Sequence, residues 1–254
     1  DPAFMGKKRE DEQELRRRVA ADAALAGRIG DPWADLERVA QAQRNLYLPY
    51  RQLESAAGQR SQLYSYAKAI VRAAKERAKP AAERRPGYSE ADIAALGRRL
   101  AQEVPIANDI EEIALSFWLS KTREYLTVDN PQVKALLGKD SPEQIAERVV
   151  SGTRLADPAF RAQALAMTPE QLAASGDPLI QFVLANDDAA QAIRTEWESA
   201  VSGPTSRAGE KIAQARFAVY GTNQYPDATF SLRLSYGQVK GWTHQGVTVE
   251  PFTY

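Results

Sequence analysis

The amino-acid sequence predicts a mainly helical protein, an irregular domain of many helices followed by a short C-terminal β segment. From Lys7 to about Tyr220, apolar residues recur three and four positions apart, which is the period of an amphipathic helix. In the same region, short polar residues followed by proline mark repeated helix starts. After Tyr220, apolar and polar residues alternate, as in a half-buried strand. We therefore assign residues 1–220 to a helical domain and residues 221–254 to a β segment.

Three apolar stripes predict helices within the first domain. Residues at this spacing lie on one face of an α-helix. The stripes are Leu63, Ala67, Ile70 and Val71, then Ile93, Leu96, Leu100 and Val104, and then Ile106, Ile110, Ile113 and Phe117.

Five helix starts carry a capping residue followed by proline. The polar side chain can accept a hydrogen bond from an unpaired backbone N–H, and proline at the first helical position loses no hydrogen bond. The pairs are Asp31-Pro32, Ser141-Pro142, Asp157-Pro158, Thr168-Pro169 and Asp177-Pro178. Gln144 and Gln171 extend two of the starts to capping boxes. So many starts indicate many short helices rather than a few long ones.

Three positions interrupt the helical pattern. Pro49 falls inside a helical stretch over residues 33–57 and predicts a kink or break. Residues 79–87 have the composition of a loop, and Gly203-Pro204 marks a third boundary. No repeat of fixed period is evident, so a regular solenoid is not supported.

The C-terminal segment predicts strands. Over residues 229–236 apolar side chains alternate with polar ones, a second strand begins between Val239 and Trp242, and a turn at residues 244–246 leads to a third strand at residues 247–249. A strand needs a sheet to pair with, and one short meander is marginal by itself. The segment therefore points to a β domain that lies mostly outside this chain.

Composition excludes several function classes. Among 254 residues, Lys and Arg count 33 and Asp and Glu also count 33, so the formal net charge is zero and gives no overall attraction to nucleic acid. Cysteine is absent, which removes disulfides, thiol nucleophiles and cysteine-based zinc sites. No apolar run approaches the ~20 residues of a membrane-spanning helix.

The chain begins at Asp1 without a signal-peptide pattern and ends abruptly at Tyr254, which suggests a piece of a longer protein.

The sequence contains no recognisable catalytic, metal or cofactor site. His244 is the only histidine, and its neighbours are those of a solvent-exposed hairpin turn. A Gly-x-Ser-x-Gly nucleophile motif and the glycine-rich phosphate motifs do not occur. We expect no catalytic residue, no bound metal and no cofactor in this chain.

Charged runs have ordinary structural interpretations. Residues 16–18 are three arginines, but Glu12 and Glu14 lie four positions before Arg16 and Arg18, which predicts ion pairs on a helix surface rather than an anion site. The pair Asp187-Asp188 is expected near a helix N-terminus, where acidic side chains complement the helix dipole, rather than on a metal.

Two further groups are interpreted in the same way. Glu111-Glu112 is also expected near a helix N-terminus. The aromatic side chains of Phe117, Trp118 and Tyr125 are expected in the core rather than in a base-stacking platform.

One motif carries a family resemblance. Pro226, Asp227, Ala228, Arg233, Tyr236 and Gly237 form a Pro-Asp-Ala-x-x-x-x-Arg-x-x-Tyr-Gly pattern. This pattern resembles the junction between the helical domain and the second barrel of bacterial serine dipeptidyl peptidases of the dipeptidyl-peptidase 7 and 11 type. Weaker similarity at residues 71–80 and 117–124 extends the resemblance over most of the chain.

The resemblance implies a chymotrypsin-like double β-barrel interrupted by a helical insertion that caps the cleft. Residues 1–220 would be the cap, and residues 221–254 would begin the second barrel. Such enzymes release dipeptides from peptide N-termini, need no cofactor, form homodimers, and work in the periplasm or at the surface of Gram-negative bacteria. Their catalytic His, Asp and Ser lie in segments outside this chain, so no catalytic or substrate-binding residue can be transferred. We interpret Asp227 and Arg233 as a structural pair that aligns a strand, in preference to a substrate contact.

Two functions remain open from the sequence. In the first, the chain caps a serine exopeptidase, positions peptide N-termini, and has no peptidase activity by itself. In the second, it is a non-catalytic helical binding or adaptor module of a periplasmic protein. The adaptor explains the helices and the zero net charge equally well, but it leaves the β segment unexplained.

Overall fold

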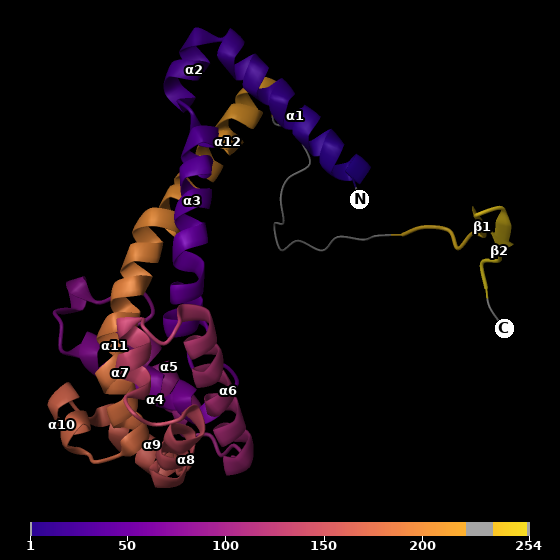
Figure 1. Ribbon diagram of the computed structural model, residues 1–254. Coiled ribbons are helices and arrows are strands. Elements are labelled where there is room, and N and C mark those ends of the chain that lie inside the picture. The colour runs from indigo at the N-terminus through magenta and orange to yellow at the C-terminus, as the bar shows by residue number, and fades with distance from the viewer. Residues whose placement is uncertain (1, 222–235, 253–254) are drawn as a thin grey trace. The chain divides into compact units, whose positions relative to one another are not determined.

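The computed structural model describes residues 2–221 and 236–252 (Figure 1). It confirms the mainly helical fold with a short β segment near the C-terminus. The chain divides into two compact units, one of Ile29–Ile212 and the other of Asp1–Arg28 with Ala213–Tyr254.

The larger unit is a helical domain with a single apolar core. Its elements are α3 (Pro32–Tyr50), the π-helical turn η1 (Arg51–Ser55), α4 (Gln62–Arg77), the 3₁₀ turn η2 (Ala81–Glu83), α5 (Glu90–Leu100), α6 (Asn108–Leu126), α7 (Pro131–Leu137), α8 (Pro142–Gly152), α9 (Pro158–Ala166), α10 (Pro169–Ala174), α11 (Pro178–Trp197), the π-helical turn η3 (Glu198–Ser202) and the first part of α12 (Gly203–Tyr220).

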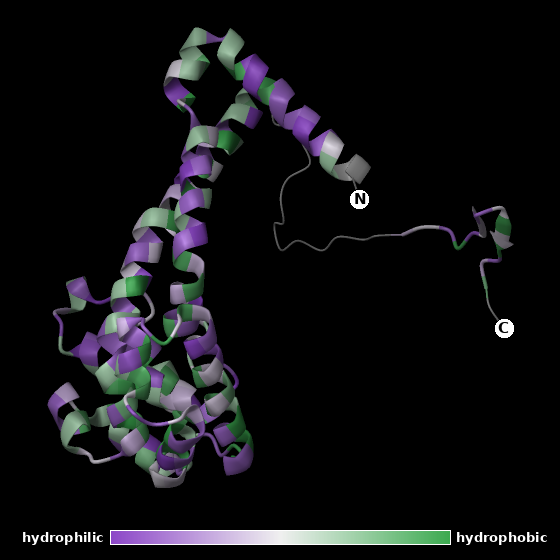
Figure 2. Ribbon diagram, in the orientation of Figure 1, coloured by the Kyte–Doolittle hydropathy of each residue, from purple (hydrophilic) through white to green (hydrophobic). Residues whose placement is uncertain are grey.

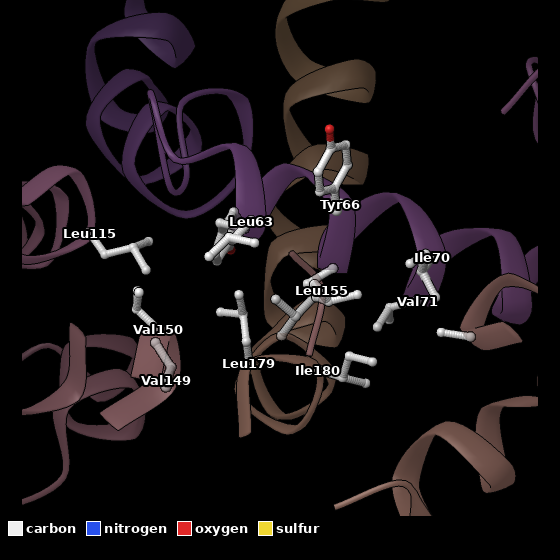
Figure 3. Packing of buried hydrophobic residues seen from close by; sticks show 14 of the residues in the cluster. Leu63, Tyr66, Ile70, Val71, Leu115, Val149, Val150, Leu155, Leu179 and Ile180 are labelled. Atoms are coloured by element: carbon white, nitrogen blue, oxygen red, sulfur yellow. The ribbon is translucent and has the colours of Figure 1, made fainter. Parts of the chain in front are cut away.

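Helix α4 lies at the centre of this core. Leu63, Ala67, Ile70 and Val71 are fully buried, which confirms the first predicted stripe. Figure 3 shows Leu63 together with side chains from α6, α8 and α11. Figure 2 shows apolar residues gathered among the packed helices, whereas α1 is mostly hydrophilic. Burial of this continuous apolar surface is the main stabilising term for the unit.

All five predicted helix starts are confirmed. Each capping side chain accepts a hydrogen bond from a backbone N–H in the first turn of its helix, and the capping boxes at Ser141 and Thr168 are formed. The structure adds a capping box between Ser89 and Asp92 at α5, and a further Asn130-Pro131 start at α7. These features depend on residues two or three positions apart, so they form wherever the local sequence supports them.

The other two stripes agree less well with the structure. In the stripe that begins at Ile93, Leu100 is buried, but Val104 lies beyond the end of α5 and is 41% exposed. In the stripe of α6, Ile110, Ile113 and Phe117 are 58%, 64% and 63% exposed. The reason is that α6 also carries apolar residues on its opposite face, and that face packs in the core beside α8.

Two of the three predicted interruptions are confirmed. Helix α3 ends one residue after Pro49, where the chain changes to the π-helical turn η1, and residues 79–87 form a loop that contains η2. An element boundary does fall at Gly203-Pro204, because η3 ends at Ser202 and α12 begins at Gly203, but the chain stays helical from α11 through η3 into α12. A π-helical turn before Pro204 gives the helix a way to continue past a residue without an N–H.

The two π-helical turns begin at a stacked aromatic pair. Tyr50 is the residue before η1 and Trp197 is the residue before η3. Their ring centroids are 4.5 Å apart with an interplanar angle of 4°. Stacking of these rings therefore holds α3 beside α11 at the point where both change geometry.

The smaller unit contains α1 (Pro2–Ala21), α2 (Ala23–Ile29), the end of α12, and a two-stranded antiparallel sheet of β1 (Trp242–His244) and β2 (Val247–Val249). Gln245 and Gly246 both have positive φ, 50° and 77°, as a two-residue hairpin turn requires. The predicted turn and last strand are confirmed, and the strand expected to start between Val239 and Trp242 starts at Trp242. The predicted strand over residues 229–236 lies outside the described residues except for Tyr236, which has no regular structure.

Candidate functional site

An apolar groove between η1 and α6 is the candidate functional site. It has a volume of about 660 Å³. Ile110, Ile113, Phe117 and Tyr125 of α6 form one wall, and all four side chains are at least 45% exposed. Arg51 and Gln52 of η1, with Arg60 of the loop that follows, line the other side. A cavity of this size and lining is typical of a binding site.

Hydrogen bonds below the groove hold its two walls together. Trp118 of α6 donates from Nε1 to the carbonyl oxygen of Gln52 at 2.8 Å. Thr122 Oγ1, one turn further along α6, donates to the carbonyl oxygen of Trp118 at 2.8 Å and lies 3.2 Å from the side-chain amide of Gln52. All three residues are buried. The buried face of α6 therefore positions η1, and the outer face of α6 remains open to the groove.

A buried charge cluster holds η1 from the core side. Arg72 of α4 donates to both carboxylate oxygens of Glu54, at 2.8 and 2.5 Å, and to Asp187 of α11 at 2.9 Å. Lys68 lies 3.2 Å from Glu54, and Lys75 lies 2.9 Å from Asp187. Paired charges of this kind satisfy each other where water is excluded. The cluster thus connects η1, α4 and α11.

The cluster shifts the pKa values of its members. Burial would raise the pKa of Glu54, but hydrogen bonding to Arg72 and the charge of Lys68 hold that pKa below its ordinary value. Burial likewise acts against ionisation of Asp187, yet Lys75 and Arg72 lower its pKa. Burial and the charge of Arg72 lower the pKa of Lys68. Both carboxylates are therefore ionised at neutral pH.

The interpretation of Asp187-Asp188 as residues near a helix N-terminus is wrong. Both lie well inside α11, which begins at Pro178. Asp187 is buried against Arg72, which precedes it by 115 positions, and Asp188 accepts a hydrogen bond from Lys75. No local pattern marks a partner so distant in the sequence, so this role could not be predicted.

Glu111 lies in the first turn of α6, as expected, but it stabilises a different helix. Its carboxylate accepts hydrogen bonds from Ser61 Oγ at 2.6 Å, Gln62 N at 3.0 Å and Leu63 N at 3.1 Å. These donors lie at the start of α4. Glu111 therefore caps the central helix of the core from outside that helix.

Replacing Glu111 with Ala is expected to lower the free energy of unfolding by about 2–3 kcal/mol, because the buried N–H of Leu63 loses its acceptor. Urea denaturation of the variant measures this loss. The matched control is Glu112→Ala on the same helix, which should change stability by about 0.5 kcal/mol or less. Equal effects of the two substitutions would contradict the capping role.

The other predicted residues have mixed outcomes. The helix-surface ion pairs are confirmed, with Arg16–Glu12 and Arg18–Glu14 both at 2.6 Å. His244 is exposed at the end of β1, as expected for a hairpin. Trp118 is in the core as predicted, but Phe117 and Tyr125 are not, because they lie on the outer face of α6.

The junction motif is only partly described. Pro226, Asp227, Ala228 and Arg233 lie outside the described residues, so the pairing of Asp227 with Arg233 stays a prediction. Tyr236 and Gly237 are exposed and have no regular secondary structure.

The sequence did not predict that Gln52, Arg51 and Arg60 line a groove. A signal for the groove existed in α6, where apolar residues occupy two opposite faces and only one face can pack on the core.

Among residues 2–221 and 236–252, no three acidic or histidine side chains are grouped to hold a metal, and no helix is long and apolar enough to cross a membrane.

The helical fold and the comparisons with known proteins together place this chain in the class of peptidase-related helical domains. The whole chain, residues 1–254, matches the family described as peptidase S46, and the chain belongs to that family. It is 31% identical over 207 residues to the Asp/Glu-specific dipeptidyl-peptidase of Shewanella putrefaciens, a match that covers 77% of this chain and 28% of the relative. The resemblance to bacterial dipeptidyl peptidases is therefore confirmed, and the chain spans only about a quarter of that relative's length.

Proposed function

We propose that this chain is the helical domain of a bacterial serine dipeptidyl peptidase, and that it covers the active-site cleft of the parent enzyme and limits entry to peptide N-termini. The observation that supports the proposal is the family match over the whole chain, combined with a described structure that is mostly helical. The dipeptidyl-peptidase relative supports the reaction class.

The catalytic groups of the parent enzyme are proposed to come from other segments. The chain has one histidine, and His244 is exposed on a hairpin. A Ser-His-Asp triad needs a histidine held between a serine and a buried aspartate. On this proposal residues 221–254 begin the second barrel of a chymotrypsin-like catalytic domain, and the parent is a homodimer in the periplasm or at the surface of a Gram-negative bacterium.

The helical domain contributes by position rather than by chemistry. A domain that blocks one end of a cleft holds the substrate amine at a set distance from the scissile bond, which favours cleavage after the second residue. The packed core and the cluster around Arg72 make the larger unit rigid enough to act as such a barrier.

The purified 254-residue chain is expected to release no dipeptide from a panel of dipeptide–chromophore substrates, whereas the full-length parent releases them. Absorbance of the free chromophore measures the rate. Release by the chain alone at a rate comparable to that of the parent would contradict the absence of a triad.

The matched control uses the same substrates with acetylated N-termini. The parent enzyme should not cleave these, because the cap restricts it to free peptide N-termini. Efficient cleavage of acetylated peptides would contradict the cap, and a parent that cleaves neither set would favour an adaptor.

A further inference from the structure

We propose that the groove between η1 and α6 is a binding site for a peptide segment that carries apolar side chains and at least one carboxylate. This inference concerns a surface of the helical domain itself, and it does not depend on the position of any catalytic group.

The first argument is the double apolar character of α6. Ile110, Ile113, Phe117, Lys121 and Tyr125 follow one another at intervals of three and four residues and so form one stripe. The opposite face, with Leu115, Trp118 and Leu119, fills the core. A helix that is apolar on both sides is typical of one that is covered on both sides. Exposed side chains of this size, gathered along a groove, mark an interaction surface.

The second argument is the charge of the groove. Arg51, Arg60 and Lys121 line it, and within the described part of the chain no acidic residue does. Lys121 Nζ lies 5.9 Å from the ring centroid of Phe117 and 5.8 Å from that of Tyr125, which holds the ammonium group beside the apolar wall. It also pairs with Glu124 at 2.6 Å. The excess of cationic groups favours an occupant with a carboxylate.

The apolar wall and the cationic groups of the groove together match a peptide segment with alternating apolar and acidic side chains. The probe is an acetylated and amidated peptide of sequence Leu-Asp-Phe-Glu-Leu, labelled for fluorescence anisotropy. Its partner is the amide peptide Leu-Asn-Phe-Gln-Leu, which has the same shape without the charges.

The 254-residue chain is expected to bind the acidic peptide saturably, and the amide peptide at least about fivefold more weakly. Phe117→Ser should weaken binding of both peptides by about tenfold or more, because it removes the central apolar contact. Arg60→Ser should weaken binding of the acidic peptide and leave that of the amide peptide unchanged.

Val128→Ser is the matched control in the same unit. Val128 is 60% exposed, close to the 63% of Phe117, and it does not line the groove, so this variant should bind both peptides like the unchanged chain. The proposal is overturned if the acidic peptide shows no saturable binding, or if Phe117→Ser and Val128→Ser have equal effects. It is also overturned if sedimentation velocity shows self-association that Phe117→Ser abolishes, since the occupant would then be a second copy of the chain.

Discussion

Replacing Arg72 with Met is expected to lower the free energy of unfolding of this protein by about 3–5 kcal/mol. Arg72 is 6% exposed and makes three hydrogen bonds to two buried carboxylates, those of Glu54 and Asp187. Methionine fills a similar length but offers no donor. The substitution removes all three hydrogen bonds and leaves the two buried carboxylates with only the more exposed Lys68, Lys75 and Arg194 as cationic partners among the described residues, and removal of one partner of a buried pair is costly for that reason. Urea denaturation followed by circular dichroism measures the loss.

Arg38→Met provides the control for this prediction. Arg38 also pairs with a carboxylate, that of Asp35, but its side chain is 72% exposed. Exposed pairs contribute little, so the change should be about 1 kcal/mol or less. If both substitutions cost the same, the cluster around Arg72 does not hold η1 to the core.

The effect of Arg72→Met should also depend on pH. The pKa values of Glu54 and Asp187 are lowered in the folded protein, so the stability that these groups contribute is fully present above their unfolded values, about 4, and is lost as pH falls through the folded values. Without Arg72 both pKa values rise. The difference in stability between the two proteins should therefore shrink below about pH 4, and a difference that stays constant down to that pH would contradict the ionic origin of the effect.

Replacing Arg161 with Met is the second substitution with a large expected effect, a loss of about 3–4 kcal/mol. Arg161 of α9 is fully buried, and its hydrogen-bond acceptors among the described residues are carbonyl oxygens rather than carboxylates. Its guanidinium donates to the carbonyl oxygens of Leu100 at 2.7 Å, Gln102 at 2.6 Å, Leu155 at 2.8 Å and Ala156 at 2.9 Å. Arg161 therefore connects the C-terminal end of α5 with the loop before α9. The helix dipole favours a cation at that end of α5.

Two costs add in this variant. The carbonyl groups of Leu100 and Leu155 lose their donor inside the protein, and the contact of the guanidinium with the Tyr66 ring, 4.5 Å from the centroid, is lost. Thermal and urea unfolding measure the change. Arg154→Met is the control, because Arg154 packs on the ring of Phe160 at 3.9 Å but is exposed, and its loss should cost about 1 kcal/mol or less. A smaller effect for Arg161→Met than for Arg154→Met would contradict this role.

Local features of the fold could be read from the sequence. The caps at Asp31, Ser141, Asp157, Thr168 and Asp177 each join atoms two or three residues apart, so neighbouring residues contain all the information that they need. The hairpin turn at Gln245-Gly246 is equally local. The stripe of α4 was also correct, since its residues have no competing apolar face and all of them are buried.

The candidate site depends on contacts that no local pattern shows. Glu111 meets Ser61 across 50 positions, and Asp187 meets Arg72 across 115. The predicted burial of Phe117 failed because both faces of α6 are apolar, and only packing against α8 decides which face enters the core.

The sequence by itself determined the helical class, the helix starts and the relation to dipeptidyl peptidases, because each of these is written in short runs of neighbouring residues. The tertiary structure alone decided which face of α6 is open, which carboxylates share Arg72, and that a groove with cationic groups lies beside η1. These three features have one physical cause. The free energy of burying a side chain or a charge depends on the partners that folding brings to it from distant parts of the chain.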